Sequence, residues 1–192
     1  MSEITETSIG ALFKFCPACA SPNIHCMPSG GIPERKWVCQ DCGFQYYHNV
    51  AASGSIVVGT ARGIVLLERA KDPRKGTFTV PGGFVNPNEG AGEAALRECL
   101  EEIGWAPDSI HYLGSYPNQY TYAGVPYWTC DTYFWTDATE AGELSLQVDI
   151  RESTRVVFVH PDSIPWNMIS FESTRRAIRE YIKIHPQSAP KD

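Results

Sequence analysis

The sequence predicts a domain of mixed helix and strand, of the α/β or α+β class, that follows a small cysteine-rich module. Three observations support this. Two C-x-x-C pairs lie near the start of the chain, at 16–19 and 39–42. Short β-branched apolar runs begin after residue 50, and two segments of helical composition interrupt and follow them. Strands around one helix, with a second helix at the end, are typical of layered α/β packing.

The composition suits one catalytic domain with a small added module. The 192 residues are 43% hydrophobic and 20% charged, with a formal net charge of −6. An acidic chain is poorly suited to binding nucleic-acid phosphates, so we expect no nucleic-acid partner. No basic segment precedes an apolar run, and the uncharged stretches are too polar to span a bilayer. We therefore expect a cytoplasmic protein with no signal peptide and no membrane partner.

The two C-x-x-C pairs predict one structural Zn²⁺ site. Each pair can turn two thiolates toward one point, and the segment between the pairs can bring the four together. Four protein ligands leave no position for water, which is why the zinc would be structural. The alternative is two unrelated turns or a redox pair. The predicted ligands are Cys16, Cys19, Cys39 and Cys42.

The predicted zinc ribbon spans residues 13–48. Within it we expect strands at 36–39 and 44–47 and a hairpin turn at 28–31. So small a unit has little apolar core, so metal binding would supply much of its folding free energy. The three remaining cysteines are expected to be buried thiols, the common state of a free cysteine: Cys26, Cys99 and Cys130.

The second predicted domain spans residues 50–186. Its first strands are expected at 55–58, 63–67 and 77–80, the last ended by a Pro-Gly-Gly turn at 81–83. A helix follows at 91–103, with Gly90 and Glu93 as a capping box and Gly104 as the C-cap. The remaining elements are strands at 111–116, 126–135 and 155–160 and a helix at 171–185.

Three glutamates of the first helix share one side. Glu98 and Glu102 are four residues apart, and Glu101 is three from Glu98. Like charges at these spacings cost about 0.2–0.5 kcal/mol per pair. Mg²⁺ or Mn²⁺ would use them, because hard cations bind several carboxylate oxygens. The alternative for an isolated ExxEE pattern is a solvated acidic face.

Residues 83–105 resemble the Nudix box, G-x5-E-x7-R-E-U-x-E-E-x-G-U, in which U is bulky and aliphatic. Every fixed position is occupied, by Gly83, Glu89, Arg97, Glu98, Glu101, Glu102 and Gly104. Cys99 and Trp105 depart at the two U positions, which are packing positions. Proteins similar to NADH pyrophosphatases also place a four-cysteine zinc ribbon before a Nudix domain, and this chain resembles them over about residues 13–185. The resemblance implies the Nudix α/β/α sandwich with a mixed sheet.

The resemblance implies a metal-dependent hydrolase. It would cleave the pyrophosphate bond of a nucleoside diphosphate linked to another moiety, of the NADH, ADP-ribose or FAD type, and release two phosphate monoesters. Mg²⁺ or Mn²⁺ would bind Glu98, Glu101 and Glu102, with a carbonyl oxygen of Gly82 or Gly83. Arg97 would pair with Glu89. The base would be a box glutamate or a later one; Glu152 is our first choice among the later ones, ahead of Glu140 and Glu143.

Residues 115–122 occupy the place where NADH pyrophosphatases carry S-Q-P-W-P-F-P-x-S. Ser115, Pro117 and Tyr120 match in part. Ser115, Tyr120 and Tyr122 are therefore our candidates for substrate binding, because tyrosine rings can stack on a nucleobase. Aromatic residues on strands also serve as core or interface, which is the alternative. The resemblance further implies a possible homodimer.

A second class of function is a catalytically weak Nudix ligand sensor, or a regulator whose zinc ribbon binds nucleic acid or protein. Two observations favour an enzyme. All the box glutamates are present, as a catalytic metal site requires. The first 50 residues carry three basic and four acidic side chains, which speaks against a ribbon that binds nucleic acid.

Overall fold

The computed structural model describes residues 13–29, 32–122, 125–138, 146 and 153–185. The chain divides into two compact units, residues 1–50 with 119–128, and residues 51–118 with 129–192. None of the described helices has the length and apolar character needed to cross a membrane.

The first unit contains a three-stranded antiparallel sheet. Its strands are β1 (Ile24–Ser29), β2 (Ile32–Cys39) and β3 (Gln45–Tyr47), in the order β1-β2-β3. Trp37 is fully buried there, and Phe13 packs edge-on against it at 5.5 Å between ring centroids. The predicted strands at 36–39 and 44–47 are present. Part of the predicted hairpin turn, residues 30–31, lies outside the described residues.

Most of a seven-stranded mixed sheet belongs to the second unit, and residues 119–122 of β8 and 125–128 of β9 belong to the first. The main strand order is β10-β5-β4-β9-β8, with β6 paired to β5 and β7 to β4. β4 runs parallel to β9 and antiparallel to β5 and β7. The strands are β4 (Ala51–Thr60), β5 (Gly63–Arg69), β6 (Phe78–Thr79), β7 (Gly82–Phe84), β8 (His111–Tyr122), β9 (Val125–Asp137) and β10 (Ser153–Val159).

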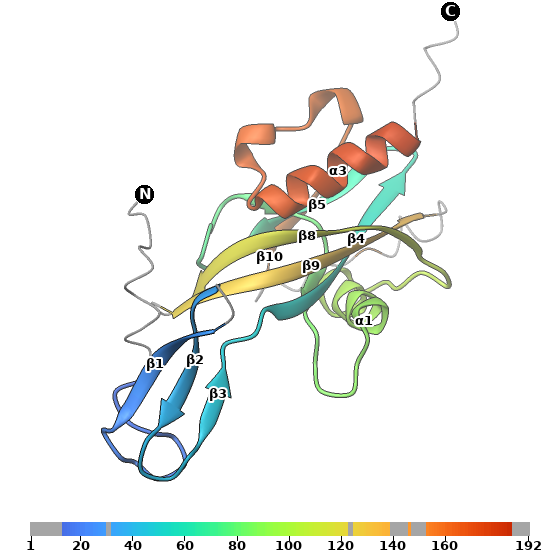
Figure 1. Cartoon of the computed structure of the whole chain (residues 1–192). Helices are drawn as coiled ribbons and strands as arrows, with labels where there is room; N and C mark the ends of the chain where they lie inside the picture. The colour runs from blue at the N-terminus through green and yellow to red at the C-terminus, as the bar shows by residue number, and fades with distance from the viewer. Residues whose placement is uncertain (1–12, 30–31, 123–124, 139–145, 147–152, 186–192) are drawn as a thin grey trace, which may run out of the picture. The chain divides into compact units, whose positions relative to one another are not determined.

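Two helices cover opposite faces of this sheet (Figure 1). Alternate residues of β4 explain how, because successive side chains of a strand point to opposite faces. Ile56 and Val58 pack with α1 (Ala91–Ile103), whereas Val57 packs with α3 (Glu172–Ile184). Two short 3₁₀ helices, Pro161–Ser163 and Trp166–Met168, precede α3. The predicted α/β/α layering with a mixed sheet is confirmed.

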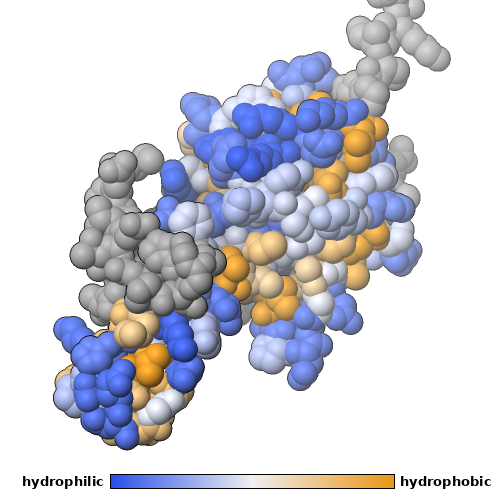
Figure 2. All heavy atoms as spheres, in the orientation of Figure 1, coloured by the Kyte–Doolittle hydropathy of each residue, from blue (hydrophilic) through white to orange (hydrophobic). Residues whose placement is uncertain are grey.

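The helix ends follow the sequence closely. α1 spans Ala91–Ile103, as predicted; the Gly90 N–H donates to Glu93 Oε2 at 2.7 Å, and Gly104 caps the C-terminus with φ 69°. α3 is amphipathic: Ala177 and Ile178 are fully buried, while its outward face carries exposed charged side chains, seen as the hydrophilic upper surface in Figure 2. Both helices therefore owe their stability to burying one face.

Three expectations are corrected by the structure. Cys130 is exposed and Cys26 is only half-buried, so only Cys99 is the buried thiol we expected. Cys130 alternates along β9 with the buried Thr129 and Asp131, and therefore faces the other side of the strand. The Pro-Gly-Gly segment is not a turn, because Gly82–Phe84 forms β7 and pairs with β4.

Candidate functional site

A close approach between β4 and the start of α1 sets the position of the helix. A Cβ on Gly54 would lie 2.0 Å from the backbone oxygen of Ala91, so only glycine allows this contact. The loop before α1 is closed by the Asn86 N–H, which donates to Glu89 Oε2 at 2.8 Å. These contacts hold α1 where Glu98 and Glu102 lie beside β7.

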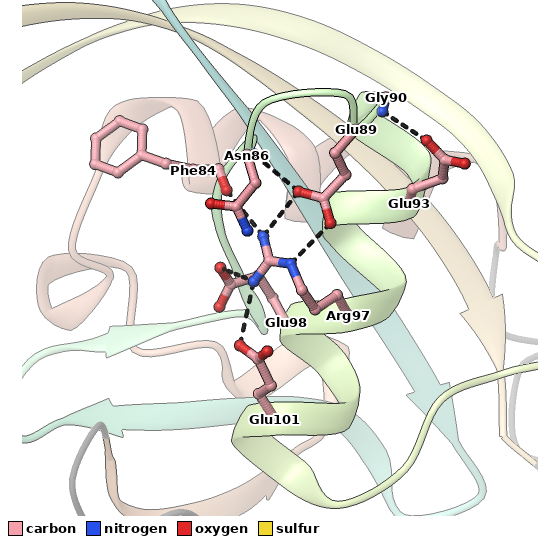
Figure 3. A network of polar contacts seen from close by, with 8 residues as sticks. All are labelled: Phe84, Asn86, Glu89, Gly90, Glu93, Arg97, Glu98 and Glu101. Carbon is pink, nitrogen blue, oxygen red and sulfur yellow. Dashed lines mark hydrogen bonds and ion pairs between the residues drawn. The ribbon is translucent and has the colours of Figure 1, made fainter.

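Arg97 connects the loop, the helix and β7 (Figure 3). Its Nε and Nη2 donate to the two carboxylate oxygens of Glu89 at 2.7 and 3.0 Å. Its Nη1 donates to Glu98 at 2.7 Å and to Glu101 at 3.1 Å, and Nη2 also donates to the Phe84 carbonyl at 3.0 Å. The predicted pairing of Arg97 with Glu89 is confirmed.

These charge-assisted bonds affect both partners. The hydrogen bonds from Arg97, and then from the Asn86 N–H, hold the pKa of Glu89 below its ordinary value. The hydrogen bonds to Glu89 and Glu98 raise the pKa of Arg97. Both groups stay ionised at neutral pH, and a bidentate pair with one quarter or less of each side chain exposed is geometrically well defined.

Glu98 is less exposed than Glu101 on the same helix. Its side chain is 19% exposed, against 57% for Glu101. Burial raises the pKa of Glu98, and the hydrogen bond from Arg97 opposes that rise. A Cβ on Gly83 would lie 2.3 Å from Glu98 Oε1, so the carboxylate rests directly on the glycine backbone. A nearby cation would stabilise the charged form of this carboxylate.

Glu102 contacts β7 from the next turn of α1. Its Oε2 accepts a hydrogen bond from the Gly82 N–H at 2.9 Å. Gly82 has φ 155°, and a Cβ there would lie 2.0 Å from Ser55 Oγ. The sequence does not predict that the Gly82 amide and the Phe84 carbonyl belong to the site. Nearly every residue has these backbone groups, so only the glycines indicate that the backbone comes close to another group here.

The structure thus brings together Gly83, Glu89, Arg97, Glu98, Glu101 and Glu102. The glutamate oxygens are the ligand type that Mg²⁺ and Mn²⁺ prefer, and the half-buried Glu98 favours a positive neighbour. In the structure as described, Arg97 fills part of that role. The residues fit a hard divalent cation by their chemistry.

The other predicted site residues are on β8 or outside the described residues. Ser115 is exposed on β8, where its Oγ lies 3.2 Å from Thr132 Oγ1. The units divide within β8, so that Ser115 belongs to the second unit and Tyr120 and Tyr122 to the first. The three candidates for the base in later loops lie outside the described residues: Glu140, Glu143 and Glu152.

The four predicted zinc ligands do come together. The sulfur atoms of Cys16, Cys19, Cys39 and Cys42 all lie within 4.8 Å of one another. Among the described residues, no other group of three or more His, Cys, Asp or Glu side chains brings its ligand atoms this close. Two sulfur pairs, Cys16–Cys42 and Cys19–Cys39, are 3.7 Å apart. A tetrahedron with Zn–S bonds of about 2.3 Å has edges of about 3.8 Å, so the spacing fits zinc.

Both C-x-x-C turns end in a left-handed residue. Ala20 has φ 58° and its N–H donates to the Cys16 carbonyl at 2.8 Å; Gly43 has φ 72° and its N–H donates to the Cys39 carbonyl at 3.0 Å. The two cysteine turns are therefore similar in geometry. Such turns present their thiols on one side, as a closed four-ligand site requires.

The fold and the box geometry agree with a known domain family. The family model described as NUDIX domain matches residues 48–180, so the chain belongs to the Nudix family.

Two curated relatives illustrate the range of similar proteins. The chain is 34% identical to the NAD-capped RNA hydrolase NudC of Pseudomonas entomophila over 104 residues. That segment covers 53% of this chain and 35% of the relative. Over 71 residues it is 39% identical to the ADP-ribose pyrophosphatase of Methanocaldococcus jannaschii, 37% of this chain and 41% of that protein. The chain thus spans well under half the length of either relative.

Solved structures show the same fold at lower sequence identity. A NUDIX hydrolase from Nitrosomonas europaea superposes with a TM-score of 0.64 at 23% identity, covering 92% of this chain and 96% of that one. The NUDIX domain of Shewanella oneidensis NrtR, complexed with ADP ribose, gives a TM-score of 0.59 at 18% identity and covers 72% and 90%. These likenesses confirm the predicted fold.

Proposed function

We propose that this chain is a metal-dependent pyrophosphohydrolase acting on a nucleoside diphosphate linked to a second moiety. The observation that supports this most is the complete Nudix box. Its glutamates are gathered on α1, with Glu98 half-buried on the Gly83 backbone and Arg97 joining loop, helix and β7.

In the proposed reaction, water adds to one phosphorus and the P–O–P bridge breaks, so that two phosphate monoesters leave. Glu98, Glu101 and Glu102, with a carbonyl oxygen of Gly82 or Gly83, would hold Mg²⁺ or Mn²⁺. When bound, the cation supplies charge neutralisation of the diphosphate and a more acidic water. Arg97 keeps the box in shape, and the proton of the water goes to a carboxylate, either a box glutamate or Glu152.

The substrate proposal rests on the relatives and on the aromatic segment of β8. One relative is named as acting on an NAD-capped RNA and another on ADP-ribose, and both names describe an adenosine diphosphate joined to a further group. The net charge of −6 speaks against an RNA body as a binding partner, so we propose NADH, ADP-ribose or FAD as the substrate type. Ser115, Tyr120 and Tyr122 are the proposed substrate contacts.

We further propose a zinc ribbon at residues 13–48 and a catalytic domain at 50–186. The four clustered thiols support Zn²⁺ as a structural ion of the ribbon. Paired C-x-x-C cysteines are typical of metal sites in intracellular proteins, and a cytoplasmic location is part of the proposal. A homodimer is part of the proposal on family grounds, and light scattering of the purified chain would test it.

A substrate panel tests the proposed activity. Release of phosphate monoesters is measured from NADH, ADP-ribose, FAD, NAD-capped RNA and dGTP with Mg²⁺ or Mn²⁺. We expect NADH or ADP-ribose to give a higher kcat/KM than dGTP, because each tyrosine stack on a second moiety contributes about 1 kcal/mol. Tyr120→Ala should narrow that gap. A triphosphate as the best substrate would contradict the proposal, and tight binding without turnover would indicate a sensor.

Glu102→Gln tests the box itself. The change keeps the side-chain volume but removes a charge from the proposed cation site, so turnover should fall by about two to four orders of magnitude. The matched control is Glu180→Gln, which removes a partly exposed carboxylate of α3 whose only ion pair among the described residues is with Lys183. Wild-type turnover by Glu102→Gln at saturating Mg²⁺ would show that the box is not the catalytic centre.

A further inference from the structure

A buried polar network lies between the sheet and α3, on the face opposite α1. Its members come from β4, β9 and the first turn of α3, and each has at most 9% of its surface exposed. None belongs to the Nudix box. They are Ser53, Asp131, Tyr133, Ser173 and Thr174.

The direction of every hydrogen bond in the network follows from the carboxylate. Asp131 can only accept when ionised, so the hydroxyls of Ser53 at 2.8 Å and Ser173 at 2.6 Å both donate to it. The Ser173 oxygen then accepts from Tyr133 at 3.1 Å, and the Tyr133 oxygen accepts from Thr174 at 3.0 Å. Burial raises the pKa of Tyr133, which keeps its hydroxyl protonated.

Asp131 has no cationic partner in any ion pair found within the described part of the chain. A buried carboxylate without a counter-charge destabilises the folded state unless other groups compensate. The N-terminal end of α3 compensates in part, because a helix dipole favours negative charge there and Ser173 lies in that first turn. An uncharged group would avoid the cost, but it could not accept a hydrogen bond on each of two oxygens from two different elements.

One strand separates Asp131 from the Nudix box. Ser53 of β4 lies opposite Asp131 on β9 and opposite Phe84 on β7. The Phe84 carbonyl accepts from Arg97, and the next pair in register is Gly54 with Gly83, on which Glu98 rests. A shift of β4 at Ser53 would therefore move the backbone against which Arg97 and Glu98 are placed.

We propose that Asp131 is a positioning residue for the cation site of the Nudix box. It binds Ser53 on one oxygen and Ser173 on the other, and so fixes β4 against α3 at the level where β7 meets Glu98. The inference rests on the proposed function, because it assigns Asp131 a role toward the same glutamates.

The test compares variants at the two ends of the network. Ser53→Ala removes the donor on β4, and Asp131→Asn leaves one acceptor oxygen for the two serines, whereas Thr174→Val removes only the last donor on α3. Mn²⁺ binding is titrated by electron paramagnetic resonance, and kcat, KM and thermal unfolding are measured on the same samples. We expect Mn²⁺ binding to weaken about tenfold in the first two variants, as is usual for groups that orient ligands, with kcat reduced in parallel. Thr174→Val should lower the Tm but keep wild-type Mn²⁺ binding.

Mn²⁺ binding and kcat at wild-type values in folded Asp131→Asn and Ser53→Ala would overturn the proposal. So would an equal loss in Thr174→Val, because that pattern means general destabilisation. If Asp131→Asn does not fold, Ser53→Ala decides. If the wild-type chain binds Mn²⁺ but hydrolyses none of the panel, the proposed function fails while the binding titration still decides the role of Asp131.

Discussion

Arg97 binds two oxygens of Glu89, one each of Glu98 and Glu101, and the Phe84 carbonyl, which requires the planar fork of a guanidinium. The pairing with Glu89 could be predicted from the box spacing. The bond to Phe84 could not, because its acceptor is a backbone atom that any residue would supply. The same limit applies to the Gly82 N–H that binds Glu102.

Cysteine reactivity gives a prediction at this scale. Burial, and next the charge of Glu102, raises the pKa of Cys99 to about 12, whereas Cys130 is exposed. The thiolate is the reacting form, so iodoacetamide should alkylate Cys130 well before Cys99 at pH 8. Mass spectrometry of peptides from the briefly treated native protein measures the order. Alkylation of Cys99 first would mean that α1 opens readily from the sheet.

Among the elements, α1 was the most predictable. Its bounds follow from Gly90, Glu93 and Gly104, which are strong local signals. β7 was not predictable, since Gly82 and Gly83 are poor strand formers and pair with β4 only because their missing side chains admit Ser55 and Glu98. β1 was missed for a similar reason, because its sequence IHCMPS lacks a β-branched apolar run after Ile24.

The close contact between β7 and α1 gives a prediction at the element scale. Gly83→Ala should displace the Glu98 carboxylate, because the added Cβ would lie 2.3 Å from Oε1. Turnover should fall by about tenfold or more, as expected when a ligand is misplaced by its support. Circular dichroism should still show a folded chain, since the displaced atoms belong to the end of a side chain.

Gly92→Ala is the matched control for Gly83→Ala. A Cβ on Gly92 would meet Phe134 at 3.5 Å, an ordinary contact, and alanine is favoured over glycine in a helix by up to about 1 kcal/mol. The control should keep wild-type turnover with equal or higher Tm. If both variants lost turnover equally, the loss in Gly83→Ala could not be attributed to displacement of the Glu98 carboxylate.

At the scale of the whole molecule, the chain combines two ways of stabilising a fold. The second unit has two apolar clusters, one on each face of its sheet. In the first unit, the described residues form one small apolar cluster around Trp37, which includes Cys16 and Cys39 of the four-thiol group. Cysteine spacing alone predicted that these four thiols come together. How β8 is divided between the units depends on long-range packing, which local sequence patterns do not report.

Zinc removal therefore should affect the first unit most. We expect one zinc per chain. Cys39→Ser should release it, because the zinc would lose one of its four thiolate ligands. Zinc binding contributes about 10–16 kcal/mol to folding in small zinc-dependent peptides, so its loss should unfold this module. Elemental analysis measures the zinc, and hydrogen exchange over residues 13–48 reports the loss of structure. Cys26→Ser is the control, since Cys26 is outside the four-thiol cluster and should keep one zinc. A wild-type chain without zinc after purification free of chelators, or a Cys39→Ser chain that keeps it, would contradict the zinc assignment.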